Sequence, residues 1–379
     1  MRGHSLRVVT WLLASVVLGC APAPSPSPSI TPPPIPADFV PWSDLVWRVV
    51  DLPPRPATAT GERIGAVTAS DDGFVAVGYR ETEEVRDGIV WSSTDGETWS
   101  AAADALFKRV ELVDVAPAPS GFVAVGVESP DGDHPSTVVF GSRDGRSWHR
   151  LPPLPATGDT DPTAIAGGVH GVLVVGADAT GASAVWQSDD GSAFERVTVT
   201  GPAADGLVDP HATDDGFVAI GTKDGAPVLL RSIDGTAWTS STIERATDVN
   251  ASNVVRGRWG FVVRGTSTPD CQDPDSCTVE DVGWWSADGT AFGRLPGGDS
   301  PVLNGVSLLV PAEDHGLLAI DGANAWSSPD GWAWRSLPEP GDGSVDIDDA
   351  VVQGGLIVAV GTEFSDQDDT FEGRIVVGG

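Results

Sequence analysis

In this 379-residue chain, the residues whose types and spacing suggest a chemical role have side chains that carry oxygen atoms. Asp114, Asp209, Asn253 and Asp348 each stand seven residues before a Gly that opens a short apolar segment. Equal offsets predict that the four side chains face the same way in equivalent elements and line a common channel. A ring of hard oxygen ligands suits Ca²⁺. The alternative is that these groups only hydrate a polar channel, and the sequence alone assigns no metal and no other cofactor.

Acidic residues outnumber basic ones throughout the chain. There are 22 Lys and Arg against 54 Asp and Glu, which gives a formal net charge of −32. Such a charge excludes nucleic acid and anionic lipid surfaces as partners. It favours cations, basic proteins or neutral molecules, unless it serves only to keep the protein in solution.

Short β-strands are the elements that must position these side chains. The segment "GFVAVG" occurs at 73–78 and again at 121–126. Similar β-branched segments bounded by Gly recur along the chain, at 171–176, 216–221, 260–265, 316–321 and 355–361. Such segments are typical of buried strands, and no helical periodicity competes with them. The sequence therefore predicts an all-β fold.

A second repeat follows the strand repeat. It reads "SSTDGETW" at 92–99, and its shared core is Ser-x-Asp-Gly-x-x-Trp/Phe. The Asp residues of its six copies are Asp95, Asp144, Asp190, Asp234, Asp288 and Asp330. Ser and Asp side chains accept hydrogen bonds from turn amides, and Gly tolerates a positive φ. The aromatic ring buries a large apolar area, so we interpret the repeat as a structural turn and not as a catalytic motif.

Repeated units of four strands and 40 to 50 residues predict a β-propeller. The strand repeats predict seven blades of four strands, and the seventh unit lacks its fourth strand. The segment "LVWRVVDLP" at 45–53 is expected to supply it, so that the N-terminal strand closes the last blade. The predicted fold is one seven-bladed propeller over residues 46–379.

The repeats resemble those of Asp-box (BNR-repeat) propellers, the group that includes sialidases, although one residue between Asp and Gly is missing in every copy. In such a propeller the loops between second and third strands share one face, opposite the boxes. These loops are expected at 79–88, 127–137, 177–183, 222–228, 266–282, 321–324 and 362–374, and they are acidic. We expect any binding site on this face.

The resemblance also sets a test for catalysis. A sialidase implies an Arg cluster, a Tyr nucleophile activated by a Glu, and an acid/base Asp. The chain has one tyrosine, Tyr79, flanked by Arg80, Glu81 and Glu83, but neighbours on a strand alternate between its faces. No Arg cluster can be placed from the sequence. Enzymatic activity stays uncertain, and a non-catalytic protein is favoured.

The N-terminus resembles a bacterial lipoprotein signal peptide over residues 1–20. Arg2 and Arg7 precede the apolar run "VVTWLLASVVL", which is too short to span a bilayer and ends at "VLGC". This resemblance implies cleavage before Cys20 and lipidation of Cys20, with an extracytoplasmic, membrane-anchored protein as the product. The Pro/Ser-rich residues 21–45 are expected to form an extended linker.

Two further cysteines, Cys271 and Cys277, stand close together in "DCQDPDSC". An exported chain meets oxidising conditions, and we expect these two to form a disulfide. A zinc site is disfavoured because two thiols are too few ligands.

These observations favour a monomeric envelope lipoprotein that binds a protein or glycan partner through its acidic loop face without catalysis. The alternatives are an exported glycoside hydrolase with a sialidase-like fold, which needs only two positioned carboxylates, and an assembly factor for a membrane complex.

Overall fold

The computed structural model describes residues 31–82, 85–102, 104–128, 136–155, 161–177, 183–198, 205–246, 248–269, 278–296, 300–365 and 370–379. Within these residues the regular structure is β-strand apart from short 3-10 helices. The 3-10 helices are η1 (Asp104–Phe107), η3 (Pro301–Leu303), η4 (Glu313–His315) and η5 (Pro340–Gly343). Across the described part of the chain, no helix has the length and hydropathy needed to span a bilayer.

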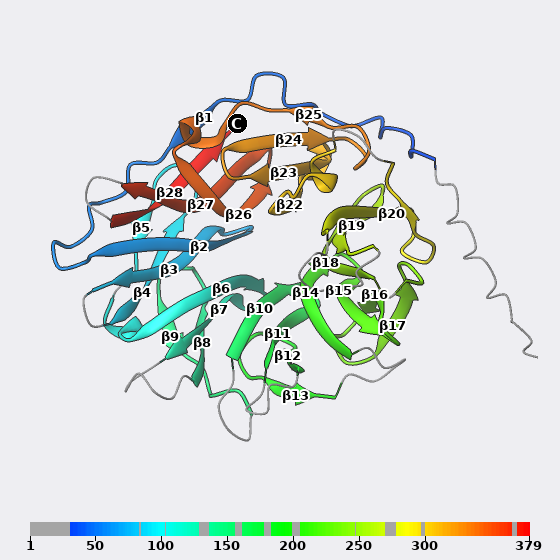
Figure 1. Cartoon of the computed structure of the whole chain (residues 1–379). Helices are drawn as coiled ribbons and strands as arrows, with labels where there is room; N and C mark the ends of the chain where they lie inside the picture. Colours follow the sequence, from blue (N-terminus) through cyan, green and yellow to red (C-terminus); the bar gives the residue numbers. More distant parts are fainter. Residues whose placement is uncertain are drawn as a thin grey trace, which may run out of the picture.

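The sheets are arranged around a central axis, so the protein is an all-β propeller (Figure 1). Five sheets have four antiparallel strands, each in chain order. Their strands are β6 (Val110–Ala118), β7 (Gly121–Glu128), β8 (Ser136–Ser142) and β9 (Trp148–Arg150); β10 (Asp161–Gly168), β11 (Gly171–Ala177), β12 (Ser183–Ser188) and β13 (Glu195–Val197); β14 (Asp205–Thr213), β15 (Gly216–Lys223), β16 (Ala226–Ser232) and β17 (Trp238–Thr242); β18 (Val249–Gly257), β19 (Gly260–Ser267), β20 (Glu280–Ser286) and β21 (Gly293–Arg294); and β22 (Leu308–Pro311), β23 (Leu317–Asp321), β24 (Asn324–Ser328) and β25 (Arg335–Ser336).

The remaining strands form one eight-stranded sheet instead of two separate blades. Its members are β1 (Trp47–Val49), β2 (Gly61–Ser70), β3 (Gly73–Glu81), β4 (Arg86–Ser93), β5 (Ser100–Ala101), β26 (Val345–Gln353), β27 (Leu356–Ser365) and β28 (Thr370–Gly378). The prediction of seven blades is therefore wrong, because the structure has five four-stranded blades. The expected closure by the N-terminal strand is present, since β1 pairs with β28 from Trp47↔Gly378 to Val49↔Val376.

One bridge between strands joins the two parts of the large sheet. Strand β2 pairs with β28 in parallel through Gly61 and Phe371. A Cβ on Gly61 would lie 2.3 Å from the Phe371 ring, so a larger residue here would require that ring to move. Gly61 begins the first unit and Phe371 lies near the start of the third strand of the last unit, and the sequence repeat carries no signal that they pair.

The Ser-x-Asp-Gly turns have the hydrogen bonds expected from their residue types. In the first copy the Ser93 hydroxyl donates to Asp95 Oδ1 over 3.0 Å and accepts from the Gly96 amide over 2.8 Å. Asp95 Oδ1 accepts from the amides of Glu97 and Thr98 at 2.9 and 2.8 Å. These donors favour the ionised form and lower the pKa of Asp95. The carboxylate thus stabilises its own turn.

The glycine of each turn also packs against the preceding unit. Gly235, with φ of 79°, would place a Cβ 2.4 Å from Leu173 of β11. In the same way Gly96 would place one 2.5 Å from Leu356 of β27, across the chain ends. Glycine is therefore required in the turn for two reasons: the backbone has a positive φ, and a side chain would collide with the neighbouring sheet.

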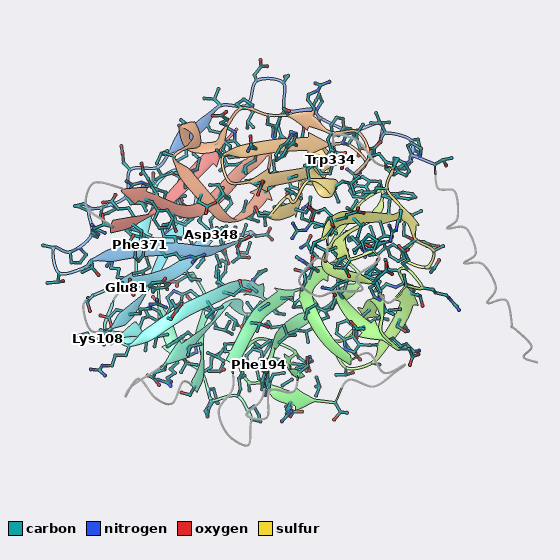
Figure 2. All side chains as sticks on the ribbon, in the orientation of Figure 1. Glu81, Lys108, Phe194, Trp334, Asp348 and Phe371 are labelled. Atoms are coloured by element: carbon teal, nitrogen blue, oxygen red, sulfur yellow. The ribbon has the colours of Figure 1, made fainter. Side chains whose placement is uncertain are left out.

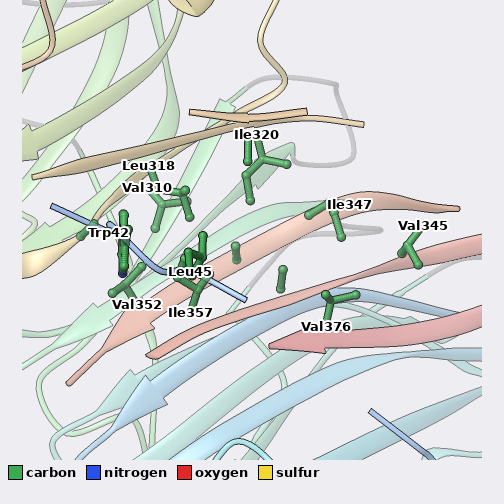
Figure 3. Packing of buried hydrophobic residues seen from close by; sticks show 14 residues of the cluster. Trp42, Leu45, Val310, Leu318, Ile320, Val345, Ile347, Val352, Ile357 and Val376 are labelled. Carbon is green, nitrogen blue, oxygen red and sulfur yellow. The ribbon is translucent and has the colours of Figure 1, made fainter. Parts of the chain in front are cut away.

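Residues 31–46, which we call the strap, pack on the propeller ahead of β1. Trp42 and Leu45 are 9% and 6% exposed and belong to a hydrophobic cluster with Val310, Ile357 and Val376 (Figure 3). The amide of Val46 donates to the carbonyl of Gly379 over 3.3 Å. Packing therefore begins on the N-terminal side of the predicted domain boundary at residue 46.

Candidate functional site

Two opposite faces of the propeller follow from the direction of its strands. The turn between β2 and β3 lies beside the first Ser-x-Asp-Gly turn, because Ser70 pairs with Gly73 and Phe74 pairs with Ser93. We call this end of the strands the box face. The hairpins between second and third strands, such as the one joining Glu81 to Arg86, lie at the other end, which we call the loop face.

A pocket of about 240 Å³ lies on the loop face where the two parts of the eight-stranded sheet meet. Its walls come from β2, β3 and β4 on one side and from β26, β27 and β28 on the other. We call it the loop-face pocket, and it is lined by Arg63, Tyr79, Glu81, Arg86, Asp346, Asp348, Thr362, Phe364 and Phe371. Figure 2 labels Glu81, Asp348 and Phe371 on these strands. The pocket lies between the predicted loops 79–88 and 362–374.

Arg63 and Asp348 form a two-pronged ion pair in the pocket. Arg63 donates from Nε to Asp348 Oδ2 over 3.2 Å and from Nη2 to Oδ1 over 2.5 Å. Burial raises the pKa of Asp348, and the neighbouring Arg63 opposes that rise. The Thr362 hydroxyl donates to the same carboxylate over 3.4 Å. This arrangement holds a planar guanidinium in a defined orientation.

Arg86 holds the opposite wall. Its guanidinium lies 4.6 Å from the centre of the Tyr79 ring, as in a cation–π contact. It donates to Glu81 over 3.2 Å and to Glu111 of the neighbouring β6 over 2.7 Å. The hydrogen bond to Glu111 outweighs the opposing effect of burial and raises the pKa of Arg86. The pocket therefore contains fixed donors, fixed acceptors and an aromatic ring.

The strand alternation expected around Tyr79 is present. Tyr79 and Glu81 line the pocket, whereas Arg80 between them points away and donates to Glu62 over 2.6 Å. Sequence reasoning missed Arg63 and Asp346, which stand at the starts of first strands from the two ends of the chain. Their convergence depends on the joining of β2 to β28, and no local signal reports it. Glu83 lies outside the described residues.

Two phenylalanines form the rim of the pocket. The rings of Phe364 and Phe371 lie with centroids 6.4 Å apart and planes at 43°. Phe364 is 68% exposed, which is unusual for a large aromatic side chain beside charged groups. An exposed aromatic face above a polar floor suits a ligand with both apolar and hydroxyl surfaces.

The residues predicted to line a channel do meet in a second, larger cavity on the propeller axis. This central cavity has a volume of about 770 Å³, and Asp114, Asp209, Asn253 and Asp348 all line it. Asp348 lies between the two cavities, since it also lines the loop-face pocket. The role of the four residues as ligands stays a prediction. In the part of the chain that the structure describes, no group of three or more His, Cys, Asp or Glu is placed to hold a metal ion.

Hydrogen bonds give the central carboxylates a structural task. Asp114 accepts from the amide of Ile165, in the next first strand, over 2.9 Å. Asp209 accepts from the amide of Val254 over 2.7 Å, and its backbone has a φ of 51°. A third aspartate, Asp349, accepts from the amide of Val67 over 2.9 Å. Each of these side chains ties the first strand of one unit to the first strand of the next.

Asp349, and not Asp348, is thus the equivalent of Asp114. In β6 and β7, Ala118 pairs with Gly121, but in β26 and β27 the pair is Gln353 with Leu356. Counting back from Gly355 therefore gives a position one residue too early. Counting twelve residues back from the glycine that ends each segment, at positions 126, 221, 265 and 361, gives Asp114, Asp209, Asn253 and Asp349. That signal was in the sequence.

The central cavity also contains His211, which the sequence analysis did not single out. Its Nε2 lies 3.1 Å from Asp209 Oδ2. Burial lowers the pKa of His211, but the negative charges of Asp209, Asp349 and Asp114 raise it by more. Burial raises the pKa of Asp349 to about 7 and that of Asp114 to about 6. Asp349 and Asp114 therefore take up protons as the pH falls through about 7 and about 6.

Three cysteines of the sequence analysis, Cys20, Cys271 and Cys277, lie outside the described residues. Lipidation of Cys20 and a disulfide between the other two therefore stay predictions. The six turn aspartates lie at the ends of third strands, away from the loop-face pocket. They accept hydrogen bonds within their own turns, as in Asp234, whose pKa the Thr236 and Ala237 amides lower to about 2.

No protein-family model and no curated protein matches the chain. Among solved structures, a puromycin hydrolase mutant in complex with PGG superposes with a TM-score of 0.53 at 16% identity, over 83% of this chain and 53% of that one. A sialidase of Trypanosoma rangeli in complex with sialic acid gives 0.46 at 13% identity, over 90% of this chain and 57% of that one. A Dyadobacter fermentans protein of unknown function gives 0.47 at 12% identity, over 89% and 99%.

This chain spans little more than half the length of the sialidase and of the puromycin hydrolase. At these identities the likeness is one of fold alone. The puromycin hydrolase superposition agrees with the all-β propeller seen in the sheet arrangement, and it does not extend to ligands or reactions.

Proposed function

We propose that this protein is an extracytoplasmic lipoprotein with an Asp-box propeller that binds a glycan, without catalysis, in the loop-face pocket. The observation that carries the proposal is the exposed aromatic rim above paired arginines and carboxylates. Sugars offer C–H faces that pack on aromatic rings and hydroxyl groups that bond to planar polar side chains. The rim of Phe364 and Phe371 and the floor of Arg63 and Asp348 offer both.

Hydrogen-bonding capacity remains in the pocket after its internal ion pairs are formed. A guanidinium has five N–H groups, and Arg63 and Arg86 each use two of them on carboxylates. Apart from the contact of Arg63 with Tyr79, the other N–H groups can donate to ligand hydroxyl oxygens, while the ion pairs hold the side chains in place. Preorganised groups of this kind lower the entropy lost on binding.

Glycoside hydrolysis is the second candidate function. Glu81, Asp346 and Asp348 line the same pocket, and a glycosidase needs two carboxyl groups on either side of the scissile bond. We favour binding because Arg86 and Arg63 hold Glu81 and Asp348 as hydrogen-bond acceptors, whereas an acid catalyst must carry a proton. The Arg pairing thus opposes the acid role.

A glycan array, followed by a test for hydrolysis, distinguishes glycan binding from glycoside hydrolysis. It also shows whether both proposals fail. We expect the wild-type protein and an Ile233→Ala variant to bind the same glycans, because Ile233 is exposed on the box face. We expect a Phe364→Ala variant to lose most of that signal. Incubation of each bound glycan with the protein should release no reducing sugar. Release by the wild type that is abolished by Glu81→Gln would favour the hydrolase, and an array without binding would reject the glycan proposal.

Lipidation has its own test in the bacterial cell. The wild-type protein should sediment with membranes and incorporate labelled fatty acid, because a diacylated Cys20 anchors it. A Cys20→Ser variant should lose the label and most of its membrane association. A matched Cys271→Ser variant should keep both. Equal labelling of the Cys20→Ser and wild-type proteins would refute the lipoprotein proposal while leaving glycan binding untouched.

A further inference from the structure

The strap is fastened to the box face by several different contacts. The Val40 amide donates to the Asp314 carbonyl over 2.9 Å, and the His315 Nδ1–H donates to the Val40 carbonyl over 2.6 Å. The Trp42 ring stacks on the His315 ring with centroids 4.4 Å apart and planes at 2°. Asp314 and His315 belong to the turn between β22 and β23, which lies at the box-face end of those strands.

An arginine ties the strap to the next sheet. Arg258, in the turn between β18 and β19, pairs with Asp38 of the strap over 2.5 Å and also with Asp314. Farther toward the N-terminus, Thr31, Pro32, Pro33, Pro34 and Pro36 form one wall of a groove whose other wall includes Trp259 and Trp285. Proline-rich segments are extended and lose little entropy when they are held against a surface. The strap therefore follows the box face from β1 to the sheet of β18–β21.

This path places the first described residue on the face opposite the pocket. The pocket residues stand at the loop-face ends of their strands, as Glu81 does at the end of β3. Strand β3 has nine residues, and a strand rises ~3.3 Å per residue, so the two faces are about 30 Å apart. Thr31 in its groove and the loop-face pocket therefore lie on opposite faces of the propeller.

We propose that the strap fixes the polarity of the protein on its membrane: the box face is turned toward the anchor, and the loop-face pocket is turned away from it. The eleven steps from Cys20 to Thr31 can span at most about 40 Å. A linker that was free as far as residue 45 would reach much farther and let the propeller turn over. The pocket thus meets ligands from outside the membrane. The polarity rests on the proposed lipidation of Cys20, and the class of ligand rests on the proposed glycan binding. The ligand class is then a cell-wall or surface saccharide and not the headgroup of the anchoring lipid.

Energy transfer to a lipid-borne acceptor tests this polarity without any ligand. Two exposed valines provide matched reporter sites, Val169 in the turn between β10 and β11 on the box face and Val279 beside β20 on the loop face. The full chain, with Cys271→Ser and Cys277→Ser, carries a dye on either Val169→Cys or Val279→Cys. It is placed on vesicles of phosphatidylcholine with an acceptor lipid, through its Cys20 acyl chains. The same chain with Cys20→Ser and an N-terminal hexahistidine tag, held on nickel-chelating lipid, keeps the dye on a single cysteine and does not depend on acylation.

We expect at least twofold higher transfer efficiency from position 169 than from position 279. Arg258→Gln and His315→Ala, each made alone because the pair could disturb folding, should reduce that ratio toward one. Neither variant should alter the binding of array glycans, since neither residue lines the pocket. Equal transfer from the two positions, or higher transfer from position 279, would overturn the proposed polarity. Loss of glycan binding in the wild type would instead reject the proposed function alone.

Discussion

Lowering the pH from 8 to 5 is expected to raise the melting temperature of this propeller by several degrees. The pKa of Asp349 is about 7 and that of Asp114 about 6, both raised by burial. An aspartate in the unfolded chain has a pKa near ~3.9, so between about pH 4 and pH 7 the folded state binds more protons than the unfolded state. Stability therefore falls as the pH rises through this window. His211 adds to the trend, because its raised pKa stabilises the fold below about 6.5, and this contribution is lost as the pH rises further.

One substitution isolates the central cavity from the general effect of net charge. Asp349→Asn removes a buried carboxylate. At pH 8 its ionisation should lower the unfolding free energy of the wild type by on the order of a few kcal/mol. We expect this variant to be more stable than the wild type at pH 8 and to show a smaller gain on acidification. Asp71→Asn, at an exposed site in the turn between β2 and β3, changes the net charge equally and should leave the pH dependence as it is. Identical melting curves for Asp349→Asn and the wild type from pH 5 to pH 8 would contradict the assigned protonation.

The turn aspartates set the lower limit of this window. Backbone amides lower the pKa of Asp95 and Asp234, in the latter to about 2. Carboxylates of this kind stabilise the fold above the unfolded pKa and lose that contribution as the pH falls toward the folded value. Stability should therefore pass through a maximum between about pH 4 and pH 5 and decline again at lower pH.

A single methyl group at Gly265 is expected to cost about 3 kcal/mol of unfolding free energy. Gly265 in β19 lies opposite an irregularity of β18 between Ala251 and Asn253. An added Cβ would lie 1.9 Å from the carbonyl oxygen of Asn250. Because that neighbour is backbone, no side-chain rotation can relieve the clash. Gly361 stands in the same relation to the Asp346 carbonyl, at 2.0 Å.

Urea denaturation measures this effect against a matched glycine. Gly168→Ala, in β10, would place its Cβ 3.4 Å from the Ala212 Cβ, an ordinary contact. We expect this control to unfold at nearly the wild-type urea concentration, with Gly265→Ala unfolding well below it at the same slope. If both variants unfolded together, the close approach of the two strands at Gly265 would be refuted.

The repeat signals in the sequence predicted the local structure well. The "GFVAVG" segments are strands, and the turn around Asp95 has the expected Ser, Asp and Gly contacts. These features depend on residues a few positions apart, so one sequence is enough to infer them. The pairing of β1 with β28 could also be inferred, because Trp47 and its neighbours repeat the pattern of a fourth strand.

Features that depend on contacts between distant residues could not be predicted. The count of seven blades failed because β2 pairs with β28 through Gly61 and Phe371, and the two parts of the sheet merge. The loop-face pocket was missed for the same reason, since Arg63 and Asp348 are 285 residues apart. Asp349 was missed for a different reason. The hairpin of β26 and β27 has the same two-residue turn as that of β6 and β7, but Gly355 lies within the turn and Leu356 takes the place of Gly121, so the count began at the wrong glycine.

Calorimetric titration of the strongest array glycan is the most direct test of the central claim, that the loop-face pocket is the binding site. Loss of one aromatic contact costs about 1 to 1.5 kcal/mol, so Phe364→Ala should raise the Kd roughly five- to tenfold. Ile233→Ala, at an equally exposed hydrophobic site on the opposite face, should bind with the wild-type Kd. An unchanged Kd for Phe364→Ala would place the glycan elsewhere on the protein and contradict the account.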